Sequence, residues 1–331
     1  MIVWMPSCST KVDLFDEPKD IPVVYGILNS DADTNFIKIT HVFHASDNPL
    51  LSASNPEMSD YPGKLDVRLT EYINGDSVRQ IILDTITLHN KQIGTFYAPD
   101  QKMYYTTEAL GKNTNDALFS YRLTVELPER TLVAYTDMVG SKDFKIQSLG
   151  VNFSPEYFGV NQPFLFHPAI KATIYDFDLA FTFKEQRTPE SDSVPRTMIW
   201  HIDTYYERDL AHHISHDMNY FNYRPENFWK HLEEFIGEDT CVPGLTRMIS
   251  AQAALVIITA GGSNLQEYMH FANIVNPEHP TENAYSNIEG ALGVFSSKMT
   301  RIQHVGLGGT TMPTLLEDER WGFKFIGGDE P

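Results

Sequence analysis

Apolar and polar residues alternate along much of the chain, and this period of two predicts a protein built mainly of β-strands. The pattern is clearest over residues 173–183, where every second side chain is large and apolar: Tyr175, Phe177, Leu179, Phe181 and Phe183. Residues 36–43 and 119–127 alternate in the same way. We therefore expect a mainly β fold that becomes α+β in its second half, where helices are added.

The first half predicts an immunoglobulin-like β-sandwich over residues 21–138. Two strand-like segments, 64–73 and 77–86, flank the dipeptide Asn74-Gly75. Both of these residues tolerate a positive φ angle, so the dipeptide predicts a tight hairpin turn. Several short antiparallel strands within about 115 residues suit a sandwich of this type.

The second half, residues 146–331, predicts a β-rich domain with two or three helices. A helix is expected at 225–236, because Pro225 suits its first turn and Gly237 suits the position just beyond its end. Another helix is expected near 263–272. Two further segments are expected to form a closing pair of strands: 286–295 and 298–307.

Residues 1–20 have the character of a residual lipoprotein signal followed by a tether. Cys8 follows a short apolar stretch and a serine, and residues 11–20 are acidic and interrupted by proline. This pattern predicts lipidation of Cys8, whose acyl chains would hold the protein at a membrane surface. The alternative is a cytoplasmic protein with an incidental early cysteine. The other cysteine, Cys241, is expected to be a small buried hydrophobe.

The charge of the chain narrows the set of partners. It carries 44 Asp and Glu against 25 Lys and Arg, a formal net charge of -19. Such a protein repels phosphate backbones and anionic lipids, which excludes a general nucleic-acid binder and leaves a lipid anchor as the only expected membrane contact. No apolar run approaches the ~20 residues that span a bilayer.

A histidine-rich segment is the main candidate for chemistry. On a helix, His212 and His216 would share one face, as would His213 and Asp217, and such pairs can hold a zinc ion. Two residues of the preceding strand, His201 and Asp203, are candidates for further ligands. The pairs lack the intervening glutamate of zinc hydrolases, so a polar surface loop is the plain alternative.

Other motifs imply no cofactor. The turn Asp31–Asn35 begins like a calcium loop but lacks the glycine and glutamate that such a loop needs. Gly261-Gly262 joins a strand to a helix, where phosphates often bind, but no lysine follows. Aromatic residues gather over 220–229, and they suit either core packing or a platform for sugars and peptides.

Two segments carry a resemblance to a known family. Cys8 with its acidic tether and then Pro22-Val-Val-Tyr-Gly-Ile-Leu28 resembles the opening of a Bacteroidota outer-membrane lipoprotein family of unknown function. The Asn287-Ile288 pair, followed by glycines and Val294-Phe295, resembles that family's closing motif. Members are commonly encoded beside TonB-dependent receptors, so the resemblance implies such a receptor as partner and a role in the envelope.

Taken together, these patterns predict a non-enzymatic protein, lipid-anchored in the outer membrane. It would bind a peptide or glycan, or assist an outer-membrane receptor in nutrient uptake. Two alternatives stay open: a metal-dependent enzyme that uses the 212–217 cluster, and a structural or adhesive surface protein.

Overall fold

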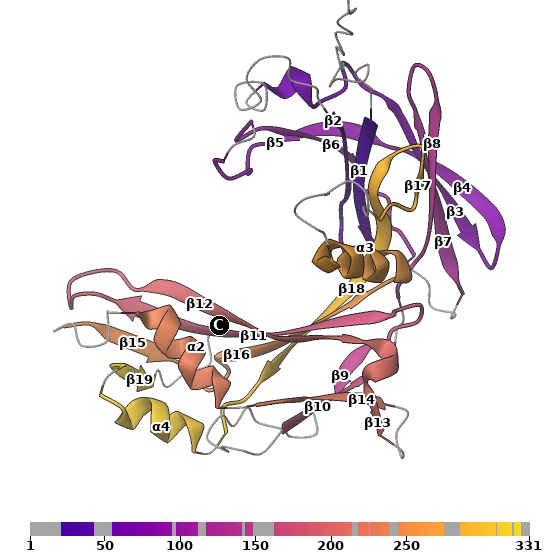
Figure 1. Ribbon diagram of the computed structural model, residues 1–331. Helices are drawn as coiled ribbons and strands as arrows, with labels where there is room; N and C mark the ends of the chain where they lie inside the picture. The colour runs from indigo at the N-terminus through magenta and orange to yellow at the C-terminus, as the bar shows by residue number, and fades with distance from the viewer. Residues whose placement is uncertain are drawn as a thin grey trace, which may run out of the picture.

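The computed structural model describes residues 21–42, 55–94, 97–111, 117–140, 143–147, 162–213, 218–224, 226–237, 244–274, 285–308, 310–319 and 321–325. Most of these residues lie in β-strands arranged in three sheets (Figure 1). The α-helices among them all belong to the second half: α2 (Asn227–Ile236), α3 (Ser263–Ile274) and α4 (Thr311–Glu317). The predicted fold class, mainly β with helices confined to the second half, is confirmed.

An N-terminal sandwich is formed by two facing groups of strands. The first group is β1 (Ile21–Asn29), β2 (Asn35–Val42), β6 (Gln101–Thr106) and β5 (Asp84–Leu88). The second group is β4 (Asp76–Ile82), β3 (Asp66–Ile73), β7 (Phe119–Glu126) and β8 (Thr131–Asp137). Their alternate side chains meet in one core, which includes Val24, Leu69 and Leu123, each with no exposed surface. The alternation of apolar and polar residues in the sequence therefore reflects strands with one face in the core and one face outside it.

The β3–β4 hairpin turns where the sequence predicted. Asn74 has φ 51° and Gly75 has φ 94°, which is the pair of positive angles that a tight two-residue turn requires. The turn between β1 and β2 likewise contains Asp31, whose carboxylate pairs with Arg301 at 2.5 Å. That contact joins a sandwich turn to a strand of the second half.

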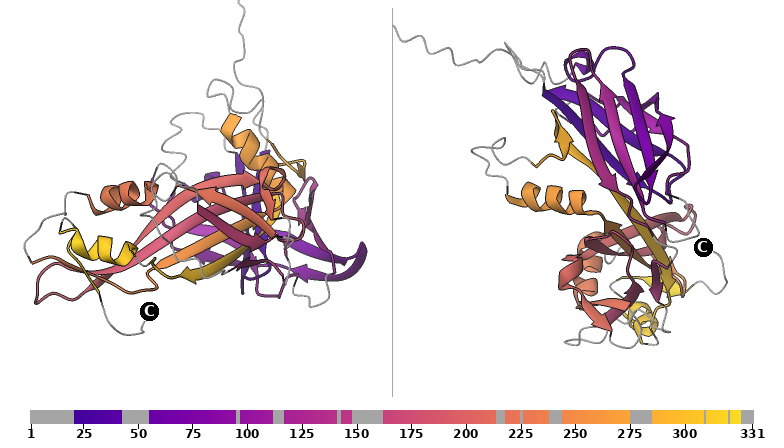
Figure 2. Two further views of the ribbon diagram at one scale, coloured as in Figure 1. Left: turned by 90° about the horizontal axis from the view of Figure 1, so that it is seen from below. Right: turned by 90° about the vertical axis from the view of Figure 1, so that its right-hand side faces the viewer.

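One long strand, β18 (Leu292–Val305), runs through both halves of the molecule (Figure 2). Its first part pairs in parallel with β1, from Val23 opposite Leu292 to Asn29 opposite Lys298. Its second part pairs antiparallel with β16 (Ala254–Gly261). The closing pair of strands predicted at 286–295 and 298–307 is wrong, because residues 292–305 form a single strand.

The far end of the chain thus completes the sandwich near its beginning. Phe295 has no exposed surface and Ile288 only 5%, and both belong to the sandwich core. Ile288 lies in β17 (Ile288–Glu289), which pairs with β8. The division predicted between residues 138 and 146 is therefore crossed by a segment that we expected in the second domain.

The second half has its own core beneath the extended sheet. That sheet continues from β18 through β16, β11 (Ile174–Gln186), β15 (Thr246–Ile249) and β19 (Phe323–Phe325), and β12 (Val194–Tyr206) also pairs with β11. A smaller sheet packs below, formed by β9 (Lys145–Gln147), β10 (Gln162–His167), β14 (Met218–Tyr223) and β13 (Ala211–His213). The predicted helix at 225–236 is confirmed by α2, and Gly237 ends it at φ 66°.

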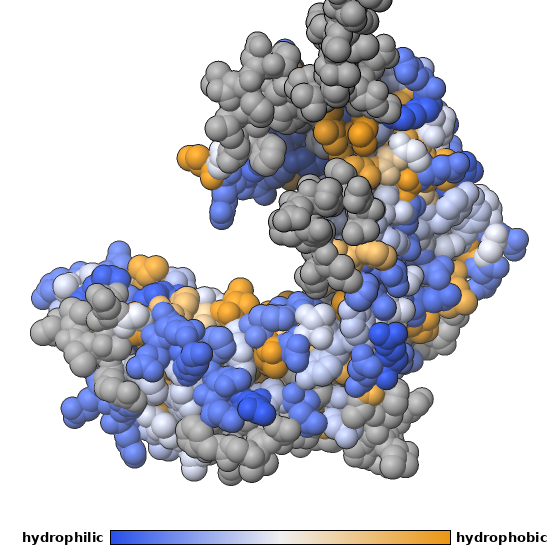
Figure 3. Space-filling model, viewed as in Figure 1, coloured by the Kyte–Doolittle hydropathy of each residue, from blue (hydrophilic) through white to orange (hydrophobic). Residues whose placement is uncertain are grey.

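The continuous sheet bends at β18, and the molecule has the outline of a C (Figure 1). Helix α3, which confirms the predicted helix near 263–272, lies in the bend against β18. We call one part of the ten-stranded sheet the lower sheet; it consists of β16, β11, β12, β15 and β19. Helices α2 and α4 cover its convex side (Figure 1). The sandwich forms the upper arm of the C, and the lower sheet forms its lower arm. We call the hollow between these two arms the recess; it is visible in the space-filling view (Figure 3).

Candidate functional site

The predicted histidine cluster lies largely outside the described residues. His212 and His213 belong to strand β13, where they pair with Asn219 and Met218 of β14. The helical spacing that would align His212 with His216 does not hold there, because residues 211–213 are extended. His216 and Asp217 lie outside the described residues, and so do Cys8 and Cys241. Metal binding at 212–217 and lipidation at Cys8 therefore stay predictions.

The Gly261-Gly262 turn is not an open anion site. The amide of Gly262 donates to the carbonyl of Ser297 at 3.0 Å. Near the start of α3, the amide of Leu265 donates to Ser296 Oγ at 3.0 Å. These amides at the start of α3 thus donate to β18 and are not available to an anion, and the hydrogen bonds fix α3 in the bend.

The Asn287 motif has a structural role at the same junction. The amide group of Asn287 donates to the carbonyls of Tyr135 and Phe295, at 3.2 and 2.7 Å, and its oxygen accepts from the amide of Phe295 at 2.9 Å. Asn264 of α3 donates to the same two carbonyls. One asparagine therefore ties strands β8 and β18 together beside the helix.

A group of three potential metal ligands lies on the recess side of the lower sheet. Asp176, Asp178 and His201 each offer a ligand atom, and these atoms lie within 4.8 Å of one another. His201 Nδ1 is 3.0 Å from Asp178 Oδ1 and 3.5 Å from Asp176 Oδ1. Their neighbours Tyr175 and Phe177 pack against Phe166 of β10 in the core of the second half. Side chains alternate along a strand, so the aspartates lie on the opposite face of the sheet, which faces the recess (Figure 1).

A β-bulge creates this group. Asp176 lies opposite Thr204, and in a regular antiparallel ladder Asp178 would then lie opposite Ile202. The register shifts between Phe177 and Asp178, and His201 takes that place. Bulges commonly re-aim a side chain next to a functional site. Here the bulge substitutes an imidazole for an isoleucine beside two carboxylates.

Thr204 orients one of the carboxylates. Its hydroxyl donates to Asp176 Oδ1 at 2.7 Å, and it lies 3.4 Å from His201 Nε2. Asp203, which the sequence suggested as a ligand, accepts a hydrogen bond from the backbone amide of Thr204 and is not part of the group. Asp176 and Asp178 were missed as ligands, although their spacing of two on a strand with one apolar face indicates a shared outer face.

The other wall of the recess is aromatic. Tyr25 of β1 is 43% exposed and meets Tyr268 of α3 edge to face, with ring centroids 6.1 Å apart. Burial, together with the hydrogen bond to Tyr268, raises the pKa of Tyr25 to about 12. Phe36 and Tyr105 form a cross-strand pair on the same side, with ring centroids 6.4 Å apart. These rings offer flat apolar surfaces beside hydroxyl groups.

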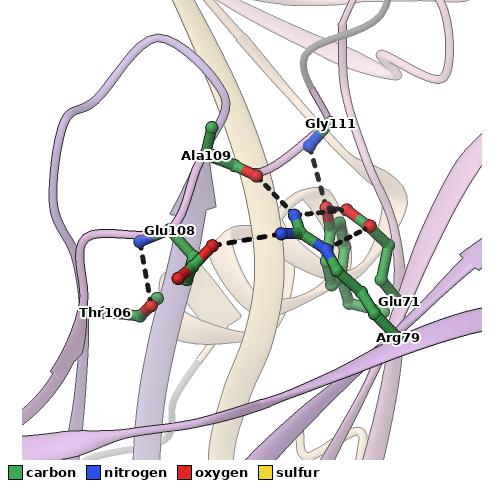
Figure 4. A network of polar contacts seen from close by, with 7 residues as sticks. Glu71, Arg79, Thr106, Glu108, Ala109 and Gly111 are labelled. Atoms are coloured by element: carbon green, nitrogen blue, oxygen red, sulfur yellow. Dashed lines mark hydrogen bonds and ion pairs between the residues drawn. The ribbon is translucent and has the colours of Figure 1, made fainter.

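A buried carboxylate in the sandwich is held by contacts within the protein. Glu71 is 5% exposed and pairs with Arg79, whose Nε lies 2.6 Å from it (Figure 4). The hydroxyl of Tyr121 donates to Glu71 and accepts the amide of Gly111. Burial and the Glu71 contact raise the pKa of Tyr121 well above its usual range. Because each of these groups is satisfied internally, the network fastens the β6–β7 connection to the sandwich.

No protein-family model matches the chain, and a search of curated protein sequences found no match. No helix in the described part of the chain is long and apolar enough to cross a membrane.

Proposed function

We propose that this chain is a lipid-anchored cell-envelope protein that binds a peptide or glycan in its recess. The observation that carries the proposal is the recess itself. One wall carries the rings of Tyr25, Phe36 and Tyr105, the other carries the polar groups of Asp176, Asp178 and His201, and the strands of both walls belong to one continuous sheet. Flat rings beside hydrogen-bonding groups suit ligands that have both apolar faces and hydroxyl or amide groups. The proposal is a binding role without catalysis.

The direction of β1 supports anchoring through Cys8. The strand begins at Ile21, at the free end of the sandwich, and runs toward the second half, because its partner β18 leaves in that direction. The segment 9–20 reaches about 40 Å if it is extended. An anchor at Cys8 would thus keep the sandwich near the membrane and hold the lower sheet away from it. The resemblance to a lipoprotein family that is commonly encoded beside TonB-dependent receptors supports such an outer-membrane receptor as the partner.

Replacing Cys8 with alanine is expected to release the protein from the membrane fraction when it is expressed in a Gram-negative host behind a complete lipoprotein signal. The thioether-linked acyl chains supply the membrane affinity, at about 0.8 kcal/mol per buried methylene. Incorporation of radiolabelled palmitate and fractionation of the membranes provide the measurement. Cys241→Ala is the matched control and should stay in the membrane with full label. Equal labelling of the Cys8→Ala protein would reject the anchor.

Replacing Tyr25 and Tyr105 together with alanine is expected to weaken ligand binding at least tenfold, because stacking on two rings is lost. Affinity electrophoresis in gels containing soluble starch, xylan or mannan, and capture of peptides from a casein digest, supply the probes. Tyr135→Ala is the control, because Tyr135 is 59% exposed on the other sheet of the sandwich. Binding that the double variant retains in full would place the ligand elsewhere.

A further inference from the structure

We propose that Asp176, Asp178 and His201 bind a divalent transition-metal ion on the floor of the recess. This inference goes beyond the proposed function, because it depends neither on the lipid anchor nor on the aromatic wall. It also differs from the metal site that the sequence suggested at 212–217.

The distances between the ligand atoms suit a shared ion. Metal–ligand bonds to histidine and carboxylate are about 2.0–2.2 Å long, so two ligands on one ion lie about 3.0 Å apart in octahedral and 3.4 Å apart in tetrahedral geometry. His201 Nδ1 lies 3.0 Å from Asp178 Oδ1 and 3.5 Å from Asp176 Oδ1. Both aspartates can therefore share one ion with the imidazole after small side-chain movements.

The donor set selects the kind of ion. One imidazole nitrogen and two carboxylate oxygens are the mixed donors that zinc and its first-row neighbours accept. Calcium and magnesium prefer oxygen alone. Three protein ligands leave at least one position for water or for a group of a bound ligand. That position would face the recess, because the ligands lie on that side of the sheet.

The backbone holds the ligands in place before an ion arrives. Asp176 and Asp178 come from β11, a strand that is paired on both sides, and the bulge fixes His201 opposite Asp178. The hydroxyl of Thr204 donates to Asp176 Oδ1 at 2.7 Å, as outer-sphere groups do around metal-binding carboxylates. The alternative use of the group is an ion pair between a protonated His201 and the two aspartates, which needs no metal.

Calorimetric titration of the purified, metal-free full-length chain with Zn²⁺ distinguishes a metal site from a simple ion pair. Wild-type protein should have one zinc site that is tighter than any other, and its unfolding temperature should rise when zinc is added. Asp178→Asn and His201→Gln should each weaken this site at least tenfold. Thr204→Val should weaken it about tenfold, the usual effect of losing an outer-sphere contact.

Two control variants make the result specific. Asp203→Asn removes the same charge from the neighbouring strand without touching the group, so it should leave zinc affinity unchanged. The triple variant His212→Gln, His213→Gln and His216→Gln should also keep the tightest site. Asp178→Asn is nearly isosteric, and its unfolding temperature without zinc reports whether it folds.

Three outcomes would overturn the proposal. The first is a wild-type protein that binds no zinc. The second is loss of the tightest site in the triple histidine variant alone. The third is equal weakening by Asp203→Asn and Asp178→Asn, which would indicate attraction of the ion by the net negative charge. If Asp178→Asn fails to fold, then His201→Gln gives the same decision.

Discussion

Replacing Gly293 with alanine is expected to destabilise the protein by about 4 kcal/mol, a large share of the 5–15 kcal/mol that holds a typical domain together. Gly293 has φ 112°, a conformation that residues with a side chain rarely adopt, and this strain alone costs about 1–3 kcal/mol. A Cβ atom at this position would also overlap the backbone carbonyl of Val24. Because Val24 is part of β1, the clash would force apart the parallel pair that closes the sandwich.

Denaturation in urea, followed by circular dichroism, measures this loss. Gly290→Ala is the matched control, because Gly290 also has a positive φ angle, 80°, but the nearest atom to its added Cβ is a side-chain carbon of Leu132 at 3.5 Å. It should cost about 1 kcal/mol, from backbone strain alone. If the two variants lose equal stability, the close approach of β18 to β1 is not what requires glycine at position 293.

Replacing Glu185 with alanine is expected to cost about 3–5 kcal/mol, because it removes the carboxylate that pairs with a fully buried guanidinium group. The Arg247 side chain has no exposed surface, and its Nε lies 3.2 Å from Glu185 Oε2. Arg196 donates to the same oxygen at 2.8 Å. A guanidinium group stays charged at any ordinary pH, so Arg247 has no neutral form to adopt.

An exposed partner of Glu185, Arg187, provides the control. Arg187 pairs with Glu185 at 3.4 Å, but its side chain is 68% exposed, so Arg187→Ala should cost less than about 1 kcal/mol. Thermal unfolding of the two variants gives the comparison. Because Arg247 also donates to the carbonyl of Trp321 at 2.7 Å, Glu185→Ala should loosen the C-terminal segment first. Proteolysis beyond residue 320 that is no faster than in wild type would contradict this order.

The sequence predicted those parts of the fold that local patterns decide. The Asn74-Gly75 turn, helix α2 with Gly237 at its end, and the alternation in β7 and β11 all depend on residues close together in the chain. The pairing of β1 with β18 joins residues about 270 positions apart, and no local period indicates it. Ser296 and Ser297 fall between the two strands predicted at 286–295 and 298–307, but both are buried within β18, and their hydroxyls bond to other segments.

The candidate metal site was predicted only in part. His201 was recognised as a potential ligand, but Asp203 was chosen as its companion because the two share a face on a regular strand. The bulge at Ile202 breaks this regularity and brings Asp178 from the neighbouring strand into place. A bulge leaves no fixed signature in the sequence, so the spacing within one strand was misleading here. Cross-strand register is the information that the sequence lacked.

The parallel pairing of β1 with β18 also decides how the molecule would respond to a pulling force. Traction between the start of β1 and the lower arm would draw the two strands in opposite directions along their common axis. The seven residue pairs from Val23–Leu292 to Asn29–Lys298 would then be sheared together, whereas a hairpin loaded at its open end unzips one bond at a time. A protein held at one end in a flowing medium would benefit from such resistance to mechanical rupture.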